Sequence, residues 1–366
     1  MDAVDDDNSL QFDTPSSIYS YLGRNLDGLS LKSHSSASAF SDCNSDRSSE
    51  FSQSSGSRNL LIAACTSDRP DDDDAIAQLV LDLESTSLET QRNAAMEIRL
   101  LAKNKTENRI RIADAGGIPP LVVLAQSPDA QIQELGVTAL LNLSLCDENK
   151  DRIVGSGAVR ALVRALKTGT AATRENAACA ILRLSYQDDI KAAFGRAGAI
   201  PPLVSLLENG TLRGKKDAAG ALYAITTMKE NKLRAVEAGV MRSLVDLMSD
   251  FEYGMVDKAA LVTQNLVSLP QARTALVEEG GIPVVVEAVE VGTQRQKEFA
   301  AGILLALSEG SLQHRLMIAR EGAIPPLIAL TQSGTTRSKQ KAEALIRCLR
   351  QPRSASNGAR TSDIPD

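Results

Sequence analysis

The feature that most constrains the fold is a short sequence motif that occurs six times between residues 115 and 327. Its fullest form is Ala-Gly-Ala-Ile-Pro-Pro-Leu at residues 197–203, and every copy has glycine at the second position. Consecutive glycines are 41, 41, 41, 41 and 42 residues apart. A constant period of this length is typical of repeat proteins, in which units that cannot bury their own apolar face stack on one another. The six glycines are Gly116, Gly157, Gly198, Gly239, Gly280 and Gly322.

Each period predicts three helices. A short first helix, such as residues 149–154, ends at the glycine, where the chain turns in a conformation that glycine adopts without steric cost. Proline follows in four copies, at the start of a second helix that runs to about Leu166 in the second copy. The third helix is the longest and has a broad apolar face, which in that copy contains Ala177, Ala178, Ala180, Ile181 and Leu184.

Composition excludes several other classes of protein. Aromatic residues make up 3% of the chain and there is no Trp, which favours an Ala-, Leu-, Ile- and Val-filled helical core. The two histidines and five scattered cysteines predict no metal site, and no phosphate loop or catalytic constellation is present. We therefore predict no cofactor and no enzymatic activity. The net charge of −6 argues against nucleic-acid binding, and no apolar run is long enough to span a membrane.

The two ends differ from the repetitive body. Residues 1–74 carry 14 acidic and 5 basic residues, and 17 serines lie within residues 1–60. Such a segment buries too little apolar area to offset its chain entropy, so we predict disorder over 1–73, a solenoid over 74–350 and a disordered tail over 351–366. Thr14, Ser48 and Ser49 are candidates for phosphorylation. The acidic head is a candidate for contact with the chain's own body. Reduced cysteines and the absence of a signal peptide favour the cytoplasm or nucleus.

The repeat resembles the armadillo repeat, which implies a right-handed, all-α solenoid of about six full repeats preceded by a partial cap. The amino-acid sequence of the repeats is most similar to the armadillo domains of plant U-box proteins, which are ubiquitin ligases whose repeats hold the substrate. Only about 74 mostly polar residues precede the repeats, so we expect a relative without its own U-box. Importin-α is disfavoured because its Trp ladder is missing here. The resemblance to plant U-box proteins rests on residues 142–144, 146–150, 174–178 and 213–219.

Stacked third helices of this class line a groove that suits an extended peptide. Two asparagines at equivalent positions, Asn142 and Asn265, are candidates to hydrogen-bond a peptide backbone, and Arg183 shares their register. A row of basic residues near the start of successive third helices suggests a second group of contacts, for acidic or phosphorylated segments. The alternative is an ordinary solvated face. The basic candidates are Arg174, Arg213, Lys215, Lys216, Arg295, Lys297 and Lys339.

The leading hypothesis is a monomeric, non-catalytic scaffold that binds protein segments in this groove. One alternative, suggested by the resemblance, is an adaptor that recruits substrates to a separate ubiquitin ligase. A third is a ligase in its own right, which would transfer ubiquitin in the presence of a purified conjugating enzyme.

Overall fold

The structure, a computed structural model, describes residues 72–350, and every regular element within that range is an α-helix. Most of the segments expected to be disordered, the candidates Thr14, Ser48 and Ser49, and the contact of the head with the body lie outside these residues. Asp72 and Asp73, which were expected to be disordered, form the start of the first helix. The first two helices form a partial unit, as expected for a cap. They are α3 (Asp72–Asp82) and α4 (Leu88–Asn104).

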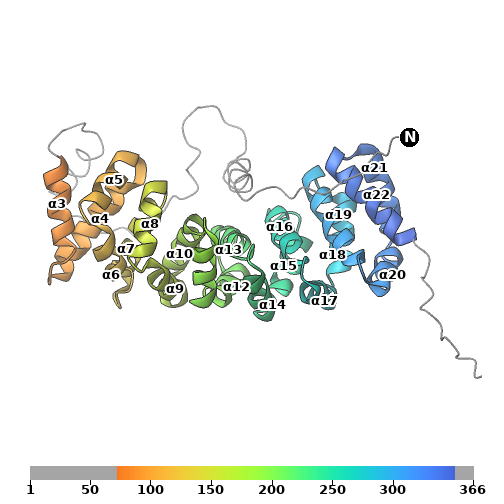
Figure 1. The fold of residues 1–366 in the computed structure, drawn as a ribbon, viewed down its shortest axis with the longest axis horizontal. Helices are drawn as coiled ribbons and strands as arrows, with labels where there is room; N and C mark the ends of the chain where they lie inside the picture. The colour runs from red at the N-terminus through yellow and green to blue at the C-terminus, as the bar shows by residue number, and fades with distance from the viewer. Residues whose placement is uncertain (1–71, 351–366) are drawn as a thin grey trace, which may run out of the picture. The chain divides into compact units, whose positions relative to one another are not determined.

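Six complete triplets follow in chain order (Figure 1). The first is α5 (Thr106–Asp114), α6 (Ile118–Leu124) and α7 (Ala130–Leu143), and the second is α8 (Asp147–Gly155), α9 (Ala158–Thr168) and α10 (Ala171–Leu184). The third is α11 (Asp188–Arg196), α12 (Ile200–Asn209) and α13 (Leu212–Ile225), and the fourth is α14 (Lys229–Glu237), α15 (Val240–Ser249) and α16 (Val256–Leu266). The fifth is α17 (Pro270–Glu278), α18 (Gly281–Val291) and α19 (Gln294–Ser308), and the last is α20 (Leu312–Arg320), α21 (Ile324–Ser333) and α22 (Thr336–Arg350).

The hinge glycines behave as their period predicts. All six have φ between 74° and 86°, the left-handed region that favours glycine, and each stands between the first and second helix of its triplet. Proline occupies the first turn of α6, α12 and α21, where no intrahelical partner is lost. The expected sixfold repetition of a three-helix unit is therefore confirmed.

The core runs through the whole series because each third helix packs on the next, from α4 through α22. The five apolar residues predicted for the third helix of the second triplet are all fully buried in α10. Second helices also pack on one another in chain order, from α6 to α21. Neighbouring triplets therefore contact each other through two layers, one of second helices and one of third helices. Phe194 in α11 is among the largest fully buried side chains.

Buried amides lock successive triplets together. Asn231 Nδ2 donates to the carbonyl oxygens of Ile225 and Lys191, both at 2.9 Å, and so ties α14 to α13 and α11 of the preceding triplet. Asn149 does the same with Arg109 and Leu143 at 3.0 and 3.3 Å. At the equivalent place in the last triplet, His314 Nδ1 lies 3.2 Å from the Leu307 carbonyl. This histidine therefore has a structural contact.

Candidate peptide-binding surface

The candidate surface is the outward face of the third helices, α7, α10, α13, α16, α19 and α22, which we call the third-helix surface. Threonine caps mark the start of several of these helices. Thr170 Oγ1 accepts a hydrogen bond from the Thr173 amide and donates to Glu134 on the preceding third helix at 2.8 Å. Thr335 makes the matching bonds with Ser338 and Glu298. The starts of α10 and α22 are thereby fixed against the preceding third helix, and Arg174 and Lys339 lie one turn later on these helices.

Several of the predicted cations are already held by this surface. Arg213 Nη2 donates to Asn176 Oδ1 at 2.7 Å, and its Nε lies 3.6 Å from Asp217 Oδ2. Arg295 Nε lies 3.8 Å from Asp257 Oδ1, and its guanidinium lies over the Phe299 ring. Both arginine side chains are therefore held by contacts within the solenoid.

Two predicted lysines are also engaged. Lys297 Nζ donates to the Glu290 carbonyl at 2.8 Å, which turns it back toward α18. Lys215 Nζ lies 5.4 Å from the centroid of the Tyr253 ring, in the next triplet. Both ammonium groups therefore already have a contact within the protein, and neither is a free charge on the third-helix surface.

Three predicted cations have no such partner. Arg174 is exposed, and Lys216 and Lys339 are half-buried. None of the three makes an ion pair or side-chain hydrogen bond with another residue in the range 72–350. Arg183 on α10 is half-buried, and its Nε is buried without a hydrogen-bond partner among these residues. Arg174, Lys216 and Lys339 can therefore take an external anion without first breaking a contact within residues 72–350, whereas the Nε atom of Arg183 is closed to one.

Lys258 is a further cation of this surface that the sequence pattern did not predict. It lies two residues after Val256, which is 41 residues after Lys215 and 41 residues before Lys297 and breaks the row of basic residues at that position. Burial is the main cause that lowers the pKa of its ammonium to about 8; Asp217 raises this pKa, Lys216 and Arg295 lower it, and Asp257 raises it. The row therefore continues across α16 by a shift of two positions, a pattern that a search at a strict 41-residue period does not detect.

The candidate asparagines are partly used within the structure. Asn142 Nδ2 donates to the Arg99 carbonyl at 3.0 Å, and Asn265 Nδ2 donates to Thr226 Oγ1 at 3.0 Å. Within residues 72–350 neither amide oxygen accepts a hydrogen bond. A bound peptide would therefore meet two acceptors on this surface, one at α7 and one at α16, which suit backbone N–H groups.

The titration of Lys258 can be predicted with its sign. Because the pKa of the folded lysine is about 8 against an ordinary value of 10.5, the unfolded chain binds more protons between these pH values, and this lysine makes stability rise with pH there. Lysine side-chain NMR of the wild type should show a midpoint near pH 8. Lys216→Gln should raise the pKa of Lys258, and Asp217→Asn should lower it. An ordinary lysine midpoint in the wild type would contradict the burial described here.

The described residues hold no group of three or more metal-ligating side chains, and no described helix is both long and apolar enough to cross a membrane. What the geometry defines is a protein of the all-helical armadillo repeat class, with a partly basic third-helix surface. The chain belongs to the family described as the plant U-box protein ARM repeat region, whose model matches residues 75–362.

Known proteins agree with this assignment. The chain is 72% identical over 236 residues to U-box domain-containing protein 4 of Arabidopsis thaliana, covering 64% of this chain and 28% of that protein. It is 66% identical over 232 residues to U-box domain-containing protein 2 of Arabidopsis thaliana, covering 63% and 33%. A crystal structure of an engineered protein matches with a TM-score of 0.69 and 28% identity, over 75% of this chain and 68% of that one. The chain spans about a third or less of the length of these two plant relatives, and whether it has a U-box of its own stays a prediction.

Proposed function

We propose that this chain is a non-catalytic protein-binding module whose third-helix surface holds an extended polypeptide segment, with a preference for acidic or phosphorylated segments. The observation that supports this most is the set of cations that have no partner among the described residues, Arg174, Lys216 and Lys339, together with the half-buried Lys258. These cations stand on α10, α13, α16 and α22, so an extended segment whose phosphates or carboxylates reach several of them gains a charge-assisted hydrogen bond at each. Such a site needs no catalytic group, and it matches the substrate-holding part of the related ligases.

Acidic peptides with and without phosphoserine, arrayed at fixed positions, test the proposal. Lys216→Glu combined with Lys339→Glu should weaken binding of the best peptides by about tenfold or more at low salt, because two attractive charges become repulsive. The difference should shrink as salt is raised.

The matched control reverses two exposed cations on first helices, Lys229→Glu with Arg320→Glu, which changes the net charge by the same amount. This control should keep affinity within about twofold, as expected for rim or remote charges. Equal binding by the wild type and the Lys216/Lys339 variant at every salt concentration would rule out the basic surface as the binding site.

A second candidate function is that of a substrate-recruiting adaptor in the ubiquitin pathway. Its support is the identity of 72% with the matching part of a plant U-box protein. Copurification of a ubiquitin ligase that is lost in the Lys216/Lys339 variant would favour this role, and ubiquitin transfer by the purified chain itself would instead indicate a ligase.

A further inference from the structure

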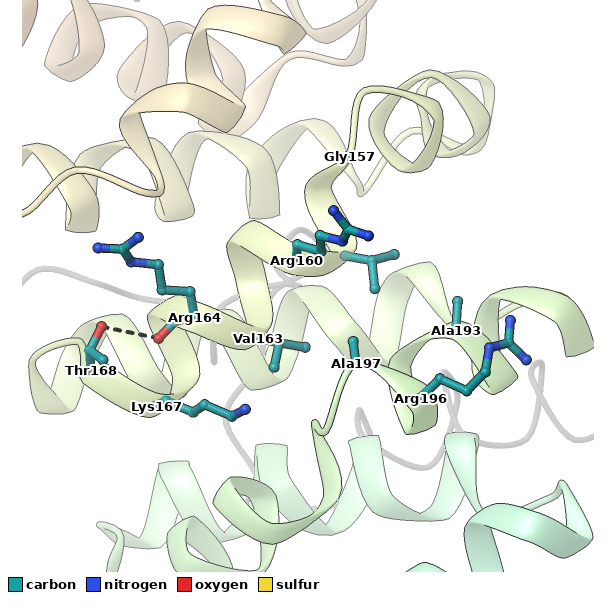
Figure 2. Close-up of a pocket in the computed structure, with 10 residues that line it drawn as sticks. Gly157, Arg160, Val163, Arg164, Lys167, Thr168, Ala193, Arg196 and Ala197 are labelled. Atoms are coloured by element: carbon teal, nitrogen blue, oxygen red, sulfur yellow. Dashed lines mark hydrogen bonds between the residues drawn. The ribbon is translucent and has the colours of Figure 1, made fainter.

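An open pocket of about 730 Å³ lies away from the third-helix surface, between α9 and α11 (Figure 2). It is formed by the second helix of one triplet and the first helix of the next, at the two hinge regions that follow Ser156 and Ala197. Its volume is in the range of pockets that hold small molecules. The proposed peptide-binding surface does not include any of its residues.

Four exposed cations surround this pocket. Arg160, Arg164 and Lys167 lie four and then three residues apart on one face of α9, and Arg196 is the last residue of α11. Lys167 Nζ rests against the second hinge, since a Cβ built on Gly198 would lie 3.3 Å from it. None of the four makes an ion pair or a side-chain hydrogen bond with any other residue that the structure describes. Within residues 72–350, all four charges are therefore available to an external anion.

The base of the pocket is apolar. Val163 is buried, and Val159, Ala193 and Ala197 are half-buried. Figure 2 draws Val163, Ala193 and Ala197 together with the four cations. Three of the four cations are arginines, whose planar fork suits bidentate contact with phosphate oxygens. A ligand with an apolar ring or chain and several phosphate groups at its edge would match both parts of this surface.

The other junctions of the chain show that the fold does not require these charges. The positions equivalent to the four cations hold no charged residue at the first junction, and at the third, fourth and fifth junctions acidic residues outnumber basic ones. The equivalent sets are Pro119, Val123, Gln126 and Gly155; Pro201, Ser205, Glu208 and Glu237; Arg242, Asp246, Ser249 and Glu278; and Pro283, Glu287, Glu290 and Arg320.

From this concentration of charge at one junction we infer that the α9–α11 pocket binds a compact ligand carrying several phosphate groups. The shared chemistry is a multiply phosphorylated ring or chain, which could be free in solution or the headgroup of a lipid. Four cations at fixed positions discriminate such a ligand from a single sulfate or carboxylate, because several charge-assisted contacts form at once.

Isothermal titration of the chain with inositol hexakisphosphate tests the inference, with sulfate at matched ionic strength as the reference anion. Arg160→Glu combined with Arg196→Glu should reduce affinity by about tenfold or more, since each lost charged hydrogen bond has a large effect. The matched control is Arg242→Glu with Arg320→Glu, because these arginines occupy the equivalent positions at other junctions and are also exposed. Thermal unfolding checks that both variants fold.

The source of the ligand is separated by a flotation assay with phosphatidylcholine vesicles, with and without phosphatidylinositol 4,5-bisphosphate. Binding to inositol hexakisphosphate without capture by these vesicles indicates a soluble ligand, and capture that depends on Arg160 and Arg196 indicates a headgroup. The Lys216/Lys339 variant should keep either activity, because those lysines lie on the third-helix surface. Absence of both activities, or equal loss in the Arg160/Arg196 variant and its control, would overturn the inference.

Discussion

Phe194→Ala is expected to destabilise the protein by about 3–5 kcal/mol, the range found when a fully buried aromatic side chain is removed from a core. Phe194 is completely buried in α11, a helix that packs against α9, α13 and α14. Those helices belong to three successive triplets, so they cannot close over the space without shifting a repeat interface. The midpoint of urea unfolding should fall accordingly, and Phe194→Leu should cost much less because most of the volume is kept.

Hydrogen exchange adds a spatial test of this prediction. In a repeat protein each unit is stabilised chiefly by its neighbours. The Phe194→Ala substitution in the third triplet should therefore raise the rate of amide hydrogen exchange most in α9, α11, α13 and α14. Val123→Ala is the control, since Val123 is 66% exposed and its truncation should leave the midpoint nearly unchanged. An unfolding midpoint for Phe194→Ala equal to that of the control would contradict the assigned burial.

Gly195→Ala is expected to cost about 3 kcal/mol or more, because an added methyl group meets the amide that joins two triplets. A Cβ at Gly195 would lie 1.8 Å from Asn231 Oδ1 and 2.6 Å from its Cγ. Asn231 is fully buried and donates to two carbonyl groups, so displacing it leaves its buried amide without these acceptors, at a cost of about 1–3 kcal/mol beyond the steric clash itself. Unfolding in urea, followed by circular dichroism, measures the loss.

A double-mutant cycle separates the clash from an ordinary effect of glycine in a helix. Asn231→Ala removes both hydrogen bonds, and once that amide is gone Gly195→Ala should add little further loss, which gives a large coupling free energy. Gly155→Ala is the matched control at the end of α8, because nothing lies within 4 Å of a Cβ there. Additive losses at residues 195 and 231 would show that the two residues are not in contact.

The repeat unit was predictable because its determinants are local. Gly198 requires left-handed backbone and Pro201 and Pro202 favour a helix start, whatever surrounds them. The face of α10 followed from helical periodicity alone. The locks between triplets were not predictable in the same way. Asn231 bonds a carbonyl 40 residues earlier, and the fit of Gly195 against its amide depends on the exact spacing of two packed helices.

The position of the candidate peptide-binding surface could be predicted from the sequence, but the contacts that its charged side chains make could not. Sequence spacing placed Lys216 and Lys297 in one basic row. Only the structure shows that Lys297 donates to a backbone carbonyl while Lys216 has no such partner in the part of the chain that the structure describes. The pocket between α9 and α11 was not predicted at all. Its four cations come from two different repeats, and their separation in space depends on how those repeats pack.

The amino-acid sequence by itself determined that this protein is a series of three-helix units turning at six glycines, because backbone conformation and helical periodicity are properties of neighbouring residues. Only the tertiary structure decided which charges are neutralised and which are available, as at Arg295, which lies beside Asp257 of the preceding repeat, and at Arg160, which has no ion-pair partner within residues 72–350. The physical reason is that Coulomb attraction and hydrogen bonding act over a few ångströms, and residues about 40 apart in the chain reach that distance only when the repeats stack.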